Sequence, residues 1–255
     1  MTEELEAHLR GQIDSSETFF WHRLRWRVVR EYLPQDRQFQ LIDVGAGAGI
    51  VGAYLQQDFP LATYRYVEPI DSLRHHLISR FGSPSDASGD LDYRAAQYVC
   101  LLDVLEHQDD DRRFIRQVVT RMAPGSTLLV TVPALPRLWS GWDRALGHER
   151  RYDRQSLAAC IDGLPLDVQE LSFLFPELVP LAFLRRHLRP PDGQPDAASA
   201  TVYAGFPALP RRVNGMLYRV GSLLLALRTK WRTGTSLFLA ATITDYPLAP
   251  DAAIG

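Results

Sequence analysis

The chain has 255 residues, of which 46% are apolar, and its 28 basic side chains stand against 30 acidic ones. This length and composition suit one larger globular domain, or a domain with an added subdomain, and they exclude a disordered chain. The formal net charge of -2 provides no overall field that would attract nucleic acid, so no nucleic-acid partner is expected.

The first third of the chain alternates between helical and extended patterns. Residues 16–33 carry apolar side chains near helical spacing and predict a helix. The segment QFQLIDVGAGAGIVGAYLQQ then predicts a short strand, a glycine turn and a second helix, which is the start of a βαβ unit. A strand is expected at 63–68 and a helix at 70–81.

Two nearly continuous apolar runs follow, at 98–104 and 126–132, and they predict strands that are buried on both faces of a parallel sheet. A helix at 109–122 separates them and ends at Ala123-Pro124-Gly125. A further helix at 153–162, the strand LDVQELSFLF and a last strand at 236–244 complete the pattern. The alternation predicts an α/β fold with an open, mostly parallel sheet.

The segment VGAGAG (44–49) lies between the first predicted strand and the helix after it. Backbone without side chains lets a ligand approach closely at such a turn, and the helix N–H groups face outward. The spacing is G-x-G-x-G, whereas a dinucleotide fingerprint reads G-x-G-x-x-G. Glu68 follows at the end of the second strand, where a carboxylate can accept both hydroxyls of a ribose. The alternative is a tight turn with a solvated Glu68.

With these motifs in order, the chain resembles the class I S-adenosylmethionine-dependent methyltransferases over roughly residues 16–244. The similar motifs are LIDVGAGAG, VCLLDVLEH, APGSTLLVTVP and GTSLFLAATI, and the branch is a bacterial small-molecule one with an FFWHRLR-like helix and a GHERRY-like segment. The resemblance implies a Rossmann-like, seven-stranded, mostly parallel sheet with flanking helices and a helical cap inserted between the last two strands.

The resemblance also assigns residues to S-adenosylmethionine. It places Glu68 on the ribose and counts Asp103 with the cofactor site, and the methionine moiety is surrounded by Asp43, Gly45, Ala46, Gly47 and Gly49. Three acidic residues compete for the adenine, namely Asp86, Asp90 and Asp92. The glycine pattern also allows an alternative, a nicotinamide-dependent oxidoreductase.

The stretch LLDVLEHQDDDRRF places Asp103, Glu106 and His107 after the fourth strand of such a sheet. The carboxyl end of that strand opens onto the crevice where α/β sheets bind ligands. Two carboxylates and an imidazole that converge there suit Mg²⁺, Mn²⁺ or Fe(II). The alternative is that the acidic residues only cap and solvate the next helix.

His148 lies after the fifth strand, again at the carboxyl end of the sheet. The set Asp103, Glu106, His107 and His148 resembles the metal ligands of the small-RNA 2′-O-methyltransferases and of the ubiquinone-pathway O-methyltransferases. The first position here is Asp where those groups have Glu. The resemblance implies O-methylation assisted by a divalent cation; without a metal, His107 or His148 can act as a general base.

The segments at 175–189 and 207–232 predict helices between the last two strands. The second places apolar side chains along one predicted helical face (Leu217, Val220, Leu223, Leu224, Leu227) among basic residues (Arg211, Arg212, Arg219, Arg228, Lys230, Arg232). This pattern suits a lid, a dimer contact or a helix on anionic lipid, and we favour the lid. An apolar lid would select a small hydrophobic or lipid-linked acceptor. We therefore expect an N-terminal helical lid at 1–35, a core of 36–174 and 233–246, and a cap at 175–232.

Cys100 and Cys160 lie in apolar surroundings, and the acidic, polar N-terminus does not read as a signal peptide. A cytoplasmic protein is expected, with peripheral contact with the inner face of the membrane and oligomerisation left open. A non-catalytic protein that keeps this fold and docks to membranes is the rival from another class, and RNA as acceptor is disfavoured by the charge balance.

Overall fold

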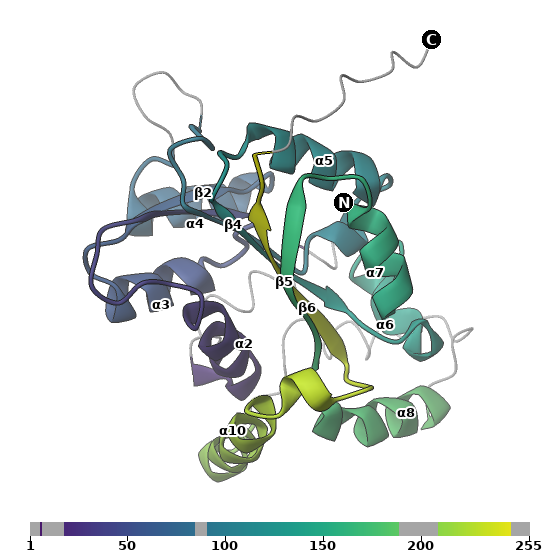
Figure 1. Cartoon of the computed structure of the whole chain (residues 1–255). Helices are drawn as coiled ribbons and strands as arrows, with labels where there is room; N and C mark the ends of the chain where they lie inside the picture. Colours follow the sequence, from purple (N-terminus) through teal and green to yellow (C-terminus); the bar gives the residue numbers. More distant parts are fainter. Residues whose placement is uncertain (1–5, 7–17, 85–90, 189–208, 246–255) are drawn as a thin grey trace.

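The computed structural model describes residues 6, 18–84, 91–188 and 209–245 (Figure 1). Within this part of the chain, six strands form one mixed sheet in the order β2-β1-β3-β4-β6-β5. The strands are β1 (Gln40–Val44), β2 (Thr63–Val67), β3 (Tyr98–Leu102), β4 (Thr127–Pro133), β5 (Leu166–Leu174) and β6 (Ser236–Ile243).

The strand directions create one edge at which most strands end. β1 pairs in parallel with β2 and β3, and β3 pairs in parallel with β4. β6 runs antiparallel to both β4 and β5, so β5 has the same direction as β1 to β4. The carboxyl ends of five strands therefore share one edge, here called the carboxyl edge. The predicted Rossmann-like, mostly parallel sheet is confirmed, although the described residues hold six of the seven strands that the resemblance implied.

Helices cover both faces of the sheet because the strands are apolar on both sides. One core contains side chains of α5 and α7, and the other contains side chains of α2, α3 and α10. The helices are α2 (Phe20–Arg30), α3 (Ile50–Asp58), α4 (Asp71–Phe81), α5 (Asp111–Arg121), α6 (Gly141–Ala145), α7 (Arg154–Ile161), α8 (Val179–Leu188) and α10 (Arg211–Leu225). Short 3-10 turns are η2 (Leu105–His107), η3 (Pro136–Leu138), η4 (Pro176–Leu178) and η5 (Arg228–Lys230).

β3, which the resemblance counted as the fourth strand, is shorter than the strand predicted at 98–104. It ends at Leu102 because Asp103 adopts a left-handed backbone with φ of 61°, a conformation that Asp tolerates better than most residues. The turn redirects the chain into η2, which carries Glu106 and His107. The acidic residues after β3 therefore belong to a tight turn at the carboxyl edge, and the helix α5 begins only at Asp111.

Helices α8 and α10 lie between β5 and β6 in the chain, and α10 packs against α2. The side chain of Asn214 fixes this contact, because its Oδ1 accepts from Phe20 N (2.8 Å) and its Nδ2 donates to Thr18 O (2.7 Å). The guanidinium of Arg23 stacks over the ring of Tyr218 at 3.7 Å. A Cβ on Gly221 would lie 2.3 Å from Leu24 Cδ1, so the two helices approach closely at this glycine.

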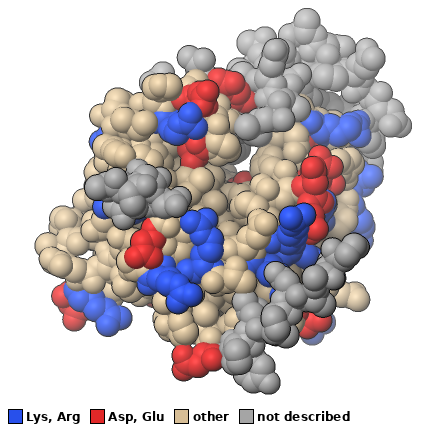
Figure 2. Space-filling view, turned by 90° about the horizontal axis from the view of Figure 1, so that it is seen from above, with Lys and Arg blue, Asp and Glu red and all other residues tan. Residues whose placement is uncertain are grey.

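None of the helices in the described part of the chain combines the length and the apolarity needed to cross a bilayer. Figure 2 shows one face of the molecule, on which acidic and basic side chains are interspersed among uncharged ones. This distribution agrees with the nearly balanced sequence charge and gives that face no field of a single sign.

Candidate active site

The glycine loop joins β1 to α3 at the carboxyl edge. Gly45, Gly47 and Gly49 all have positive φ, of 73°, 55° and 75°, which L-residues with a Cβ rarely adopt. The N–H groups of Gly45 and Ala46 donate to Val67 O at 2.8 and 3.1 Å. These bonds bind the loop to the end of β2. The spacing of the three glycines thus follows from the backbone path of the turn.

Glu68 is buried directly beside this loop. Its Oε2 accepts from Gly47 N (2.7 Å) and its Oε1 accepts from Ile70 N (2.8 Å). Burial raises the pKa of Glu68, while the two backbone N–H donors oppose that shift. Each carboxylate oxygen has a second lone pair, so the fixed carboxylate can still accept ribose hydroxyls. The loop and Glu68 therefore fit the nucleoside cofactor for which the sequence nominated them.

Asp43 is buried at the end of β1 and accepts a hydrogen bond from the Tyr64 hydroxyl at 2.9 Å. Burial raises the pKa of Asp43 to about 7. The glycine loop also lies close to the turn that follows β3, because a Cβ on Gly45 would lie 2.7 Å from Val104 Cγ2. This contact joins the candidate cofactor loop to the turn that carries Glu106.

Asp103 lies at the same edge, but its carboxylate binds other partners than the histidines. It forms an ion pair with Arg25 of α2, and it accepts from Thr131 Oγ1 at 3.0 Å. Asp103 is not in the group of side chains whose ligand atoms converge. Asp103 therefore binds α2 and β4, and the other three predicted metal ligands lie together.

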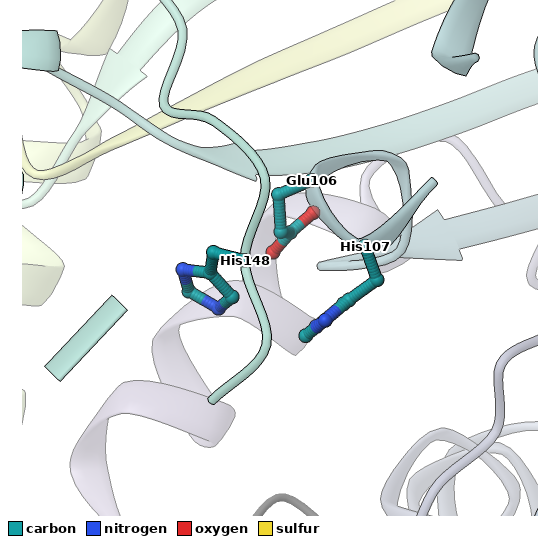
Figure 3. Close-up of side chains that lie close together, drawn as sticks. All are labelled: Glu106, His107 and His148. Atoms are coloured by element: carbon teal, nitrogen blue, oxygen red, sulfur yellow. The ribbon is translucent and has the colours of Figure 1, made fainter. Parts of the chain in front are cut away.

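Those three residues are Glu106, His107 and His148, and one ligand atom from each lies within 4.8 Å of the others (Figure 3). The two imidazole rings meet edge to face with centroids 4.8 Å apart. Glu149 N donates to Glu106 O at 2.7 Å, which holds the loop of His148 against η2. Two segments that are distant in the chain thus form one cluster.

Glu106 is fully buried, and neither of its carboxylate oxygens has a hydrogen-bond partner among the described residues. Burial, and secondly the nearby Asp103, raises the pKa of Glu106 well above its usual range. A buried carboxylate without a partner is costly. In folded proteins such a group is explained by strain, by a catalytic role, or by a bound water or ion.

Both histidines are oriented through Nδ1. His107 Nδ1 donates to Gly147 O (3.2 Å), and His148 Nδ1 donates to Asp143 Oδ1 (3.0 Å). A neutral imidazole protonated at Nδ1 has its lone pair on Nε2, and neither Nε2 accepts a hydrogen bond from a described residue, so both atoms are available to a metal or a proton. Burial, and then His148, lowers the pKa of His107 to about 4, so this ring is neutral at pH 7.

The sequence reasoning missed Asp143, which organises the outer side of the cluster. Asp143 is fully buried, and its Oδ1 also accepts from Arg151 Nε at 2.6 Å. Ser140 N donates to Asp143 Oδ2 at 2.9 Å, as part of a capping box at the start of α6. The S-x-x-D spacing in SGWD was the available signal. A carboxylate behind a ligand histidine is a common arrangement in metal sites.

The basic residues after His148 bind other groups of the protein. Arg151 is held by Asp143 and also donates to Ala134 O at 3.0 Å. Arg150 donates to Gln108 O (2.6 Å) and Asp109 O (2.8 Å), and the Tyr152 hydroxyl donates to Asp111 (2.7 Å). These side chains therefore connect the segment after His148 to η2, to α5 and to the end of β4.

Of the three adenine candidates, Asp86 and Asp90 lie outside the described residues. Asp92 Oδ1 accepts from Arg94 N (2.9 Å) and Ala95 N (3.3 Å), which is the role of a turn-forming aspartate.

Comparison with known proteins decides the family. A family model described as a methyltransferase domain matches residues 20–171, which is more than half of the chain. The chain belongs to this methyltransferase family. The match runs from the start of α2 into β5, so α8 and α10 lie beyond it. The resemblance to class I methyltransferases is confirmed. No curated protein sequence gives a significant match.

Solved methyltransferases share the fold at low sequence identity. A Haloferax volcanii complex of the Trm112 methyltransferase activator with a proposed methyltransferase contains a chain with 13% identity and a TM-score of 0.58, covering 92% of this chain and 94% of that one. A Haemonchus contortus phosphoethanolamine N-methyltransferase 2 with S-adenosyl-L-methionine has 13% identity and a TM-score of 0.53, covering 92% and 60%. A SAM-dependent methyltransferase from Archaeoglobus fulgidus has 14% identity and a TM-score of 0.50, covering 86% and 93%.

Proposed function

We propose that this methyltransferase transfers a methyl group from S-adenosylmethionine to a hydroxyl oxygen of a small hydrophobic, lipid-linked or glycan-linked acceptor. We further propose that Glu106, His107 and His148 hold a divalent cation during this reaction. The observation that carries the proposal is the buried, unpartnered carboxylate of Glu106 beside two imidazoles that each present a free Nε2.

The cofactor residues bind and orient the donor. S-adenosylmethionine, when bound, supplies the methyl group on a sulfonium. Glu68 is positioned for the ribose, and the left-handed loop from Gly45 to Gly49 turns backbone toward the ligand without side chains. Because Gly45 touches Val104, the donor loop and the turn that carries Glu106 meet at one point. Orientation of two reactants in this way supplies a large part of the rate in alkyl transfer.

The donor set fits a first-row transition ion better than Mg²⁺. Two imidazoles and one carboxylate suit Mn²⁺, Fe²⁺ or Zn²⁺, whereas Mg²⁺ prefers oxygen ligands. Such an ion, when bound, supplies positive charge that stabilises an acceptor alkoxide. Glu106 supplies the compensating charge, and Asp143 and the Gly147 carbonyl keep the two imidazole rings in the ligand tautomer.

The same geometry supports a metal-free form of the proposal. The neutral His107, whose pKa lies at about 4, has its lone pair on Nε2 and can accept the acceptor's hydroxyl proton. A methyl group would then pass from sulfur to oxygen, the C–S bond would break, and the proton would move to the imidazole. The two forms differ in whether chelation affects turnover.

The acceptor class rests on the elements outside the family match. Helices α8 and α10 follow β5 at the carboxyl edge and carry several exposed apolar side chains. Such added elements often set substrate choice. An apolar acceptor is therefore proposed for this chain. The Haemonchus contortus neighbour acts on the nitrogen of phosphoethanolamine, so an amine acceptor is the competing outcome.

Titration calorimetry with S-adenosylmethionine, S-adenosylhomocysteine and NAD⁺ tests the cofactor. Binding of the first two, reduced by Glu68→Ala, is expected; heat with NAD⁺ alone would overturn the cofactor assignment. Metal content of the purified protein is measured directly by mass spectrometry, and turnover on hydroxyl and amine acceptors is measured before and after EDTA. Bound metal and turnover that Mn²⁺ restores support the metal form. Unchanged turnover under chelation leaves the histidine form, which His107→Ala must then abolish.

A further inference from the structure

The outward face of α10 carries an uninterrupted row of apolar side chains. Their exposed fractions run from 38% at Val213 to 75% at Leu223. The row consists of Val213, Met216, Val220 and Leu223 of α10, with Leu227 in the turn just after the helix, and is called the apolar stripe. The four helical positions recur every three or four residues, so they lie on one side of α10. The opposite side is the one that meets α2, through Asn214, Gly221 and Leu225.

Positive charge borders the apolar stripe. Arg212 and Arg219 are exposed and lie on the helix next to it, and neither forms an ion pair with a described residue. The whole segment 209–234 contains no acidic residue. Arg228 is occupied by Glu170 and Glu31, but Lys230 and Arg232 are exposed and add to the same charge. An apolar face bordered by Arg and free of acidic side chains is complementary to an anionic lipid surface.

The apolar stripe lies at the end of the molecule that holds the candidate site. β5 leads through η4 into α8, and α10 leads through η5 into β6, whose first residue pairs with the last residues of β4 and β5. Figure 1 shows α8 and α10 at one end of the fold. Leu181 and Leu184 of α8 are exposed there as well. Apolar surface is therefore concentrated beside the carboxyl edge.

We propose that α10 docks this chain onto anionic membranes, with the apolar stripe inserted at the level of the headgroups and with Arg212 and Arg219 on lipid phosphates. The docked molecule turns its carboxyl edge toward the bilayer. This orientation rests on the proposed function, and it would let an apolar acceptor pass from the lipid to the site without crossing water. Docking itself requires neither the cofactor nor turnover.

Vesicle flotation of the full chain without cofactor tests the proposal. One set of vesicles contains phosphatidylcholine alone, and the other contains phosphatidylcholine mixed with phosphatidylglycerol. The wild-type chain is expected to float with the mixed vesicles and to be released by high salt. The double variant Arg212→Gln and Arg219→Gln should bind them about fivefold more weakly per arginine removed. Met216→Glu with Leu223→Glu should bind at least about tenfold more weakly.

The matched control is Leu61→Glu. Leu61 is 61% exposed, much like Met216, but it precedes β2 at the opposite edge of the sheet. It should float like the wild type. Circular dichroism confirms that each variant is folded, and calorimetry with S-adenosylmethionine reports separately on the proposed function.

Three outcomes overturn the docking proposal. The first is a wild-type chain that stays unbound with both vesicle types. The second is equal binding by the stripe variants and the Leu61→Glu control. The third is a concentration-dependent dimer in sedimentation that Leu223→Glu dissociates while no vesicle binding is seen, which would assign the stripe to a second copy of the chain.

Discussion

Asp143 and His148 form a buried pair in which the imidazole Nδ1–H donates to the carboxylate across 3.0 Å. The same carboxylate oxygen accepts from Arg151 Nε, so one aspartate holds both the His148 ring and the Arg151 guanidinium. The histidine cluster therefore depends on a residue that touches neither the acceptor nor the cofactor in the proposed mechanism.

Asp143→Asn should weaken metal binding by about 10- to 100-fold, because the amide no longer provides a charged acceptor for the His148 tautomer. It should also lower the free energy of unfolding by about 1–3 kcal/mol, since Arg151 loses its buried anion. Metal titration and urea unfolding measure the two effects. Asp110→Asn is the control, because Asp110 caps α5 and Asn caps a helix about as well. Equal metal affinity in the two variants would contradict the assigned role.

Glu106→Gln tests whether Glu106 binds a metal ion or has only a structural role. In metal-free buffer the variant should unfold at a higher temperature than the wild type, because a neutral amide replaces an unpartnered buried carboxylate. Addition of Mn²⁺ at 100 times its dissociation constant should stabilise the wild type by about 2.7 kcal/mol and leave the variant unchanged. Thermal unfolding with and without Mn²⁺ measures both effects. Glu149→Gln, at an exposed neighbouring position, should respond to Mn²⁺ like the wild type.

Asp43 predicts a dependence of stability on pH. Its pKa is about 7 in the folded protein against a reference value of 3.8, so between these values the folded state holds a proton that the unfolded chain has lost. The free energy of unfolding should therefore fall as the pH rises from about 4 to about 7, by several kcal/mol from this group. Denaturant unfolding of wild type and Asp43→Asn across this range isolates the effect. As the pH rises, the free energy of unfolding of the wild type should fall relative to that of Asp43→Asn. A difference between the two proteins that does not change with pH would exclude this role for Asp43.

Gly45→Ala should damage both the loop and the cofactor site. The left-handed backbone alone costs about 1–2 kcal/mol with a Cβ present, and the new methyl group would meet Val104 at 2.7 Å. Gly125→Ala is the matched control, because Gly125 also has positive φ but a Cβ there would meet no atom within 4 Å. Calorimetry and urea unfolding should show a larger loss of stability, and a loss of S-adenosylmethionine affinity, only in Gly45→Ala. Equal losses would mean that backbone strain alone is responsible.

Much of this fold was predictable because its signals are local. Continuous apolar runs predicted β3 and β4, because strands buried on both faces need apolar side chains throughout. The glycines predicted the turn from Asp43 to Gly49, because its backbone has positive φ at three of them. The cluster of Glu106, His107 and His148 followed from topology, since residues after parallel strands meet at one edge.

The remaining features depended on contacts that no local pattern contains. Asp103 was expected with the histidines, but the left-handed turn and Arg25 direct its carboxylate elsewhere. The exposed apolar row of α10 also differs from the apolar face that the sequence predicted. Leu217 packs against the core while Met216 is exposed, because Asn214 and Gly221 select the face that meets α2. A helix that is apolar over a wide arc does not specify its inward face.

The clamp between Asn214 and the start of α2 also bears on biosynthesis. Asn214 binds the backbone of Phe20 across a separation of 194 residues. During translation, α2 must therefore leave the ribosome long before its partner has been made. The final packing of α2 against α10 can form only after the chain has been synthesised through α10, which makes closure of this end of the molecule a late event in folding.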